Sequence, residues 1–131
     1  MSTVLLAELA GRPCPAAAAL ELVGERWALL VVREIALGAT HFGDIVAGTG
    51  APRDRIAARL KALESAGVVA RSPYQSAPTR YEYQLTASGE ELIPVLDALL
   101  EWGTVHAVSR DDPDRQHKYR PFSELELKES R

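Results

Sequence analysis

Apolar residues recur at helical spacing through the first half of the chain and predict a series of short helices. A first helix is expected from Pro15 to Val23, because proline is favoured in a first helical turn, where its missing N–H would have no partner. A second is expected from Glu25 to Leu37, and it is apolar around so much of its circumference that we place it at the centre of the core. A short third helix is expected from Phe42 to Ala47.

The fourth predicted helix, from Pro52 to Ala66, has two different faces. Its apolar residues Ile56, Leu60 and Leu63 are spaced four and three residues apart, so they point inward together. The opposite face and the exposed first turn carry polar or small residues, namely Arg53, Asp54, Arg55, Ala58, Lys61 and Ala62. Arg59 lies on the flank. One side of this helix is therefore expected to be fixed to the core while the other side is open to a partner.

The segment after this helix predicts a two-stranded ribbon. Strands are expected at Val68–Tyr74 and Arg80–Leu85, and the second alternates between two faces. The intervening SPYQSAPT is polar and contains proline, so we expect a projecting wing with a loose tip rather than a two-residue hairpin. Helix, turn, helix and ribbon in this order are the parts of a winged helix-turn-helix. The predicted fold class is therefore mainly α with a small β-wing.

The last predicted helix is long and more apolar than one small core requires. It is expected to begin near Thr86 or Ser88 and to run to about residue 108, with a bend at Pro94. Excess apolar surface on a small domain indicates a binding surface, so we expect a C-terminal dimerisation helix. Residues expected at a dimer interface or a ligand pocket are Leu5, Leu9, Trp27, Leu99 and Trp102.

The two ends of the chain are expected to differ from the central domain. Residues 1–13 are predicted to form a dimerisation arm with a short helix, and residues 14–109 the winged domain with its dimerisation helix. Residues 110–131 form a polar tail, which either docks weakly through Phe122, Leu125 and Leu127 or is disordered. The length of 131 residues fits one domain with tails.

The charge of the chain is unevenly distributed. The whole chain has a net charge of −3, yet residues 53–71 hold five basic and two acidic residues. Attraction to phosphate acts within about 8–10 Å in physiological salt, so the local charge matters more than the total. The candidate DNA-binding residues are Arg53, Asp54, Arg55, Ala58, Arg59, Lys61, Arg71 and Arg80. Arg80 is expected at the base of the wing, where a cross-strand pair with Glu82 or a plain surface charge is the alternative role.

Candidate chemistry outside this helix is sparse. The single cysteine excludes an internal disulfide and a cysteine-rich zinc site. Cys14 precedes a helix N-terminus, where thiolates are stabilised, so it is a candidate sensor of oxidants or electrophiles; the alternative is a small buried apolar residue. The histidines 41, 106 and 117 do not share metal-ligand spacing, so we expect no metal, no cofactor and no enzyme activity. No run is apolar enough to span a membrane, and a cytoplasmic location is expected.

Several motifs, in order and spacing, resemble the HxlR-type transcriptional regulators, which are winged-helix proteins similar in shape to the MarR group. The motifs are Cys14–Pro15, LELVGERWALLVVREI from Leu20, HFGDI from His41, RLKALESAGVVAR from Arg59, RYEYQLTASGEEL from Arg80 and PVLDALLEWG from Pro94. The resemblance implies a homodimeric bacterial or archaeal DNA-binding regulator, joined through N-terminal residues and the last helix. It also implies that a cysteine at the position of Cys14 senses oxidants in several members.

Two features depart from the family pattern. Members often carry polar residues where this chain has Ala57 and Ala58, so base contacts are expected to shift to Arg53, Arg55 and Arg59, or to alanine against a thymine methyl group. The tail after residue 110 is also longer than usual, and the resemblance implies nothing about it.

The sequence therefore predicts a sequence-specific transcriptional regulator of double-stranded DNA, most simply a repressor. A homodimer would place two helices in successive major grooves of a near-palindromic operator, about 34 Å apart. One alternative is a sensor module that acts through dimer geometry, with an oxidant at Cys14 or an apolar small molecule near Trp27 and Trp102 as effector. The other is a protein-interaction winged helix that binds no DNA.

Overall fold

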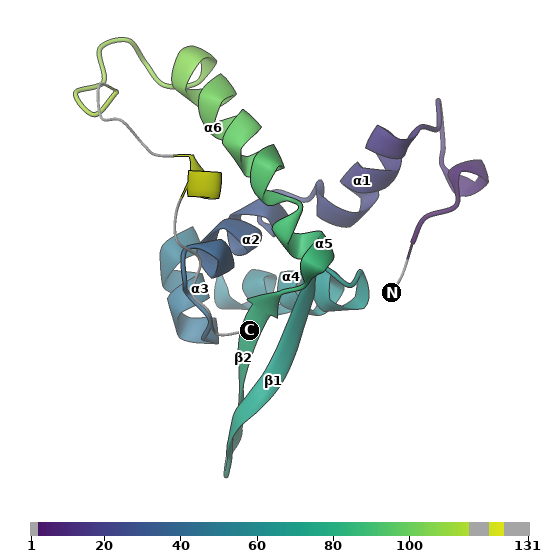
Figure 1. Ribbon diagram of the computed structural model, residues 1–131, viewed down its shortest axis with the longest axis vertical. Helices are drawn as coiled ribbons and strands as arrows, with labels where there is room; N and C mark the ends of the chain where they lie inside the picture. The colour runs from purple at the N-terminus through teal and green to yellow at the C-terminus, as the bar shows by residue number, and fades with distance from the viewer. Residues whose placement is uncertain (1–2, 116–120, 125–131) are drawn as a thin grey trace.

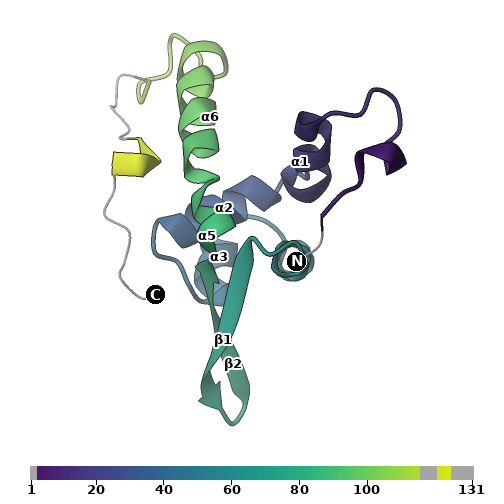
Figure 2. The same cartoon turned by 45° about the vertical axis from the view of Figure 1, so that its right-hand side comes forward.

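The computed structural model describes residues 3–115 and 121–124 as a helical body with a projecting β-ribbon (Figure 1). In chain order the elements are η1 Leu6–Glu8, α1 Pro15–Val23, α2 Ala28–Ala36, α3 Phe42–Thr49, α4 Arg53–Ser65, β1 Val69–Ser76, β2 Thr79–Leu85, α5 Ala87–Glu90, α6 Ile93–His106 and η2 Phe122–Glu124. The ribbon leaves one side of the body formed by α2, α3 and α4, while α6 extends from the other side (Figures 1 and 2). The predicted fold class, a winged helix-turn-helix with a long C-terminal helix, is confirmed.

The core is aliphatic and centred on α2, as its apolar circumference predicts. Val31 and Val32 of α2 are fully buried, and Ile56, Leu60 and Leu63 of α4 are at most 2% exposed. No polar or charged side chain is buried within the described part of the chain. The inner face of α4 is thus fixed by apolar packing alone, which confirms the predicted periodicity.

The second helix starts later than the sequence predicts. α2 begins at Ala28 rather than at Glu25, because the carboxylate of Glu25 accepts a hydrogen bond from the amide N–H of Trp27 at 2.6 Å. This short bond folds residues 24–27 into a turn before the helix starts. The α1–α2 connection is therefore a defined turn.

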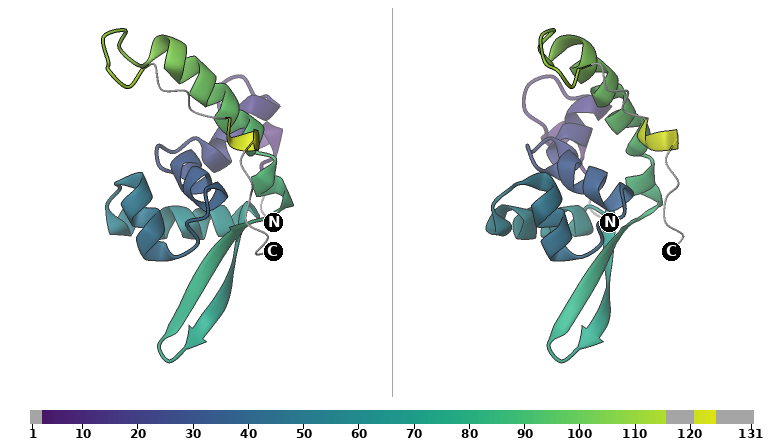
Figure 3. Two further views of the ribbon diagram at one scale, coloured as in Figure 1. Left: turned by 60° about the vertical axis from the view of Figure 1, so that its left-hand side comes forward. Right: turned by 90° about the vertical axis from the view of Figure 1, so that its left-hand side faces the viewer.

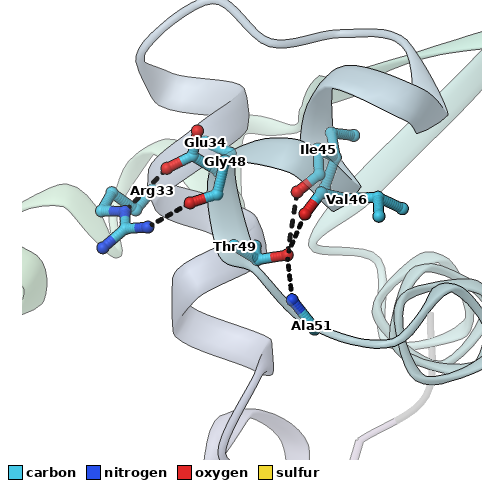
Figure 4. A network of polar contacts seen from close by, with 7 residues as sticks. All are labelled: Arg33, Glu34, Ile45, Val46, Gly48, Thr49 and Ala51. Carbon is cyan, nitrogen blue, oxygen red and sulfur yellow. Dashed lines mark hydrogen bonds and ion pairs between the residues drawn. The ribbon is translucent and has the colours of Figure 1, made fainter.

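Polar contacts join α3 to α2 and fix the turn that follows α3 (Figure 4). Arg33 pairs with Glu34 at 2.8 Å and donates to the carbonyl oxygen of Gly48 at 3.0 Å. The helices approach so closely that a Cβ added at Gly48 would lie 1.8 Å from the Glu34 carboxylate. The hydroxyl of Thr49 donates back into α3 and accepts the amide N–H of Ala51 at 3.3 Å. Hydrogen bonds at Gly48 and at Ala51 consequently fix the turn leading into α4 on both sides.

The wing is longer and its tip is tighter than predicted. The strands extend to Ser76 and from Thr79, so that only Ala77 and Pro78 connect them, with a cis peptide bond between the two. The prediction of a loose tip was wrong, because polar side chains bridge the end of the ribbon. Gln75 donates to the carbonyl oxygen of Pro78 at 3.2 Å. Both faces of the outer ribbon are exposed, so the alternation that reveals a half-buried strand is missing there.

The predicted last helix is two helices. α5 ends at Glu90 and α6 starts at Ile93, and Pro94 lies in the first turn of α6 instead of bending a continuous helix. Proline is tolerated there because its missing N–H needs no partner. Thr86 caps α5 by accepting the amide N–H of Gly89 at 3.2 Å, whereas the hydroxyl of Ser88 donates to the carbonyl oxygen of Gly67 at 3.0 Å. Of the two predicted starts of this helix, Thr86 is therefore the N-cap and Ser88 is not.

The segments before α1 and after α6 contain little regular structure among the described residues. Within residues 3–13 the leader forms one helical turn, η1, and Leu5 is 65% exposed. After α6 the chain returns, and the Asp97 carboxylate accepts the amide N–H groups of Phe122 and Ser123. Phe122 packs against the core, so the predicted docking of this residue is confirmed. The histidine at 117 and the leucines at 125 and 127 lie outside the described residues.

No helix within residues 3–115 and 121–124 is both long and apolar enough to cross a membrane.

Candidate nucleic-acid interface

The outer face of α4 is open to solvent, as its sequence predicts. Arg53, Asp54, Arg55, Ala58 and Lys61 are all exposed, on the side opposite the buried leucines and isoleucine. The wing leaves the same body and points away from α6 in every view (Figures 1 and 3). The structure therefore brings five of the eight candidate residues onto one free helical surface.

The cations of this surface differ in how they are held. The guanidinium of Arg53 lies 4.9 Å from the centre of the Phe42 ring, a cation–π contact that keeps it beside the start of α3. Arg55 and Lys61 make no side-chain hydrogen bond or ion pair with any described residue. These two side chains are free to exchange water for a ligand without first breaking a contact.

Arg71 is brought next to Lys61 at the junction of α4 and the wing. Its guanidinium stacks 4.0 Å from the Tyr81 ring and lies 3.3 Å from the Glu64 carboxylate. Lys61 and Arg71 line one crevice of about 530 Å³, together with Ala57 and Tyr83. Both cations can thus meet the same stretch of a polyanion.

Arg80 lies near the tip of the wing and not at its base. It pairs across the ribbon with Gln75, two residues from the connecting turn, and is exposed. Its alternative role as a partner of Glu82 is not observed, because the Glu82 carboxylate lies 3.8 Å from His41. Because residue 80 begins the second predicted strand, next to the connecting loop, its assignment to the base of the wing was wrong.

The wing is braced against the start of α3 by residues that no sequence pattern indicated. A register shift between Pro73 and Gln75 turns Tyr74 out of the ladder, and its ring stacks on His41 with centroids 4.4 Å apart. The amide N–H of Tyr83 donates to the carbonyl oxygen of Thr40 at 2.8 Å. A β-bulge leaves no pattern in the sequence, so this contact had no signal. The brace fixes the direction of the wing relative to α3.

Arg59 does not join the outer surface. Its side chain is 29% exposed, and its Nε lies 3.8 Å from Oε1 of Glu25, in the turn before α2. It lies on the flank of α4, as predicted, but it faces the α1–α2 turn.

The predicted dimerisation or pocket residues fall into two groups. Leu5, Leu99 and Trp102 are 65%, 50% and 61% exposed, and Leu9 is partly exposed, so all four are available to a partner. Trp27 instead packs against the core, with the Arg26 guanidinium 4.3 Å from its ring. The two tryptophans therefore do not share one environment in a single chain.

Cys14 caps the start of α1. Its Sγ accepts the amide N–H of Ala17 at 3.4 Å, and the residue is partly exposed rather than buried. The alternative of a buried apolar cysteine is not observed. Among residues 3–115 and 121–124, no three His, Cys, Asp or Glu side chains form a group that could hold a metal ion.

Comparison with known proteins places this geometry in a family. The sequence profile of the HxlR-like helix-turn-helix family matches residues 22–111, which contain the core, α4 and the wing. The chain belongs to this family. It is 41% identical over 95 residues to Rv3095 of Mycobacterium tuberculosis, an uncharacterized HTH-type transcriptional regulator, with 72% of this chain and 60% of that protein covered. The chain thus matches less than two thirds of this relative.

Solved structures of regulators share the fold of this HxlR-like chain. The crystal structure of PA1607, described as a candidate transcription factor, matches with a TM-score of 0.72 and 32% identity, over 82% of this chain and 78% of that one. The redox regulator HypR in its reduced form matches with a TM-score of 0.65 and 25% identity, over 72% of this chain and 94% of that one. The resemblance found in the sequence is confirmed at the level of family and fold.

Proposed function

We propose that the protein is a sequence-specific DNA-binding regulator that acts in the cytoplasm as a homodimeric repressor. The observation that carries the proposal is the outer face of α4, where Arg55 and Lys61 are exposed and unpaired with described residues while the inner face is anchored in the core. Membership of a family of transcriptional regulators supports it. A dimer that covers two major grooves excludes other proteins from the same DNA, which favours repression.

The docking geometry follows from α4 and the wing. The major groove is about 12 Å wide and admits one α-helix, so α4 enters it with Arg55 toward the base edges. Lys61 and Arg71 meet backbone phosphates at the crevice between α4 and the wing. Arg80, near the tip, reaches phosphate or the adjacent minor groove.

The exposed apolar residues of α6 and the leader support a homodimer. Leu99, Trp102 and Leu5 lie outside the core of one chain, and large apolar surfaces of this kind mark protein interfaces. We assign residues 1–13 to a dimerisation arm and 14–109 to the winged domain with its dimerisation helix. Two copies then present two α4 helices to half-sites about 34 Å apart.

The direct test is binding to DNA upstream of the protein's own gene, and to duplexes selected from a random library. We expect a near-palindromic site bound by a dimer, with affinity falling about 10³- to 10⁵-fold between 50 and 200 mM salt if 6–10 phosphates are contacted. Fluorescence anisotropy over a salt series, with light scattering for the stoichiometry, measures both. Selection of no duplex would remove the DNA-binding proposal and favour the protein-interaction alternative.

A response to oxidants through Cys14 is the second part of the proposal. Cys14 is partly exposed at the start of α1, and the fold resembles that of a redox regulator. Because the chain has one cysteine, a disulfide must join Cys14 either to Cys14 of a second subunit or to a small thiol. With diamide, two Cys14 thiols lose two protons and two electrons, a bond forms between their sulfurs, and diamide is reduced to its hydrazine.

The expected result is that diamide releases the wild-type protein from its operator and Cys14→Ser keeps it bound. A coupling of ordinary size changes the affinity by about 5- to 150-fold, and dithiothreitol should restore binding. Anisotropy before and after oxidation measures the change, and non-reducing electrophoresis detects the disulfide. Equal release of both proteins by diamide would show that Cys14 is not the sensor.

A further inference from the structure

Arg59 is the one candidate cation of α4 that the structure directs away from the outer face. Its Nε lies 3.8 Å from Oε1 of Glu25, and 29% of its side chain is exposed. Arg55 and Lys61, on the same helix, are exposed and make no such contact with described residues. Arg59 is therefore engaged with the protein before any DNA arrives.

The carboxylate that Arg59 meets is itself held in place. Oε1 of Glu25 accepts the amide N–H of Trp27 at 2.6 Å. The preceding residue, Gly24, caps the C-terminus of α1, and its amide N–H donates to the carbonyl oxygen of Leu20 at 2.8 Å. The turn is thus hydrogen-bonded on both sides of Glu25, and its carboxylate is oriented as an acceptor for α4.

The segment on the other side of this turn has little anchorage of its own. In α1 only Val23 is buried, while Leu20 is 63% exposed and Cys14 forms the cap. α1 packs against α4, and it extends away from the body together with the leader (Figure 1). A displacement of α1 can therefore be transmitted to α4 through the contact between Glu25 and Arg59.

We infer that Arg59 is a positioning residue that ties α4 to the α1–α2 turn through Glu25, and not a DNA contact. This inference rests on the proposed DNA-binding function and names a route by which α1 controls it. A partner or an oxidant that moves α1 therefore changes the position of α4 relative to the core through this pair.

The two roles of Arg59 predict opposite results for Glu25. If the pair positions α4, removing the Glu25 charge weakens DNA binding as much as removing Arg59. If Arg59 binds DNA, Glu25 competes with the phosphate, so removing its charge frees Arg59 and tightens binding. Glu25→Gln is suitable because the amide oxygen still accepts the Trp27 N–H.

The experiment compares Glu25→Gln, Arg59→Gln and the double variant with the wild type on the selected duplex. Since pairs of this exposure are weak, each single change is expected to reduce affinity about two- to fivefold. The double variant should be no weaker than the weaker single variant, and the salt dependence should stay that of the wild type. Glu21→Gln, exposed on α1, is the charge-matched control and should not weaken binding.

Three results would overturn the inference. They are tighter binding by Glu25→Gln than by Glu21→Gln, additive losses in the double variant, and a salt slope that falls by about 1 in Arg59→Gln, as for a lost phosphate contact. If the wild type bound no duplex, the proposed function would fail separately. Thermal unfolding of the wild type, the two single variants and the double variant would then test whether Glu25 and Arg59 interact. Non-additive changes in Tm would support the interaction, and additive changes would reject it.

Discussion

Replacing Ile56 by alanine is expected to lower the free energy of unfolding by about 2–5 kcal/mol. The Ile56 side chain is fully buried on the inner face of α4, and the aliphatic core around it cannot collapse completely into the space that remains. The loss therefore combines the transfer free energy of the missing atoms with the cost of a cavity. Urea unfolding followed by circular dichroism, at one fixed protein concentration, measures it.

The matched control for this change lies on the outer face of the same helix. Lys61→Ala should alter stability by no more than about 0.5 kcal/mol, because Lys61 is exposed and unpaired with described residues. If both variants lost similar stability, the two faces of α4 would not be distinct. The division between an anchored and a free face would then be wrong.

Replacing Arg55 by alanine is expected to weaken operator binding by about 1–3 kcal/mol while leaving the fold intact. Arg55 is exposed in the first half of α4, which faces the base edges in the proposed complex. Loss of a bidentate contact to guanine should relax the preference at one base pair of each half-site. Anisotropy with the operator and its single-base variants measures affinity and preference together.

Arg110→Ala is the control that separates a specific contact from a change in net charge. Arg110 is exposed beyond the end of α6, the helix that extends from the side of the body opposite the wing (Figure 1). Its removal lowers the positive charge by the same amount as Arg55→Ala. Equal losses from both variants would mean that Arg55 contributes only long-range attraction.

The sequence predicts those parts of the fold where burial of one face makes apolar residues recur at regular spacing. The spacing of Ile56, Leu60 and Leu63 identified the inner face of α4 because a helix with one buried side must repeat apolar residues every three or four positions. The bounds of α1 were predicted correctly from proline and glycine at its ends. Family membership rests on the same features, since its motifs lie within the core helices and the wing.

The sequence does not predict contacts between exposed or polar groups. The outer wing is polar on both faces, so no pattern in the sequence indicated its full length. Glu25 and Arg59 meet only because the α1–α2 turn packs against α4. The two residues are far apart in the sequence, and no sequence pattern predicts that a glutamate and an arginine so separated will pair. The bulge at Tyr74 is likewise a property of the backbone pairing.

The bonded turn between α3 and α4 has a consequence for operator architecture. The Arg33 bond to Gly48 ties α3 to α2, and the Thr49 bond to Ala51 fixes the turn between α3 and α4. Each base pair added to a spacer moves a half-site along the axis and also rotates it around the duplex. In the proposed dimer, a subunit with this turn cannot twist to follow, so we expect the tolerated spacer length to be set at the interface between the two subunits.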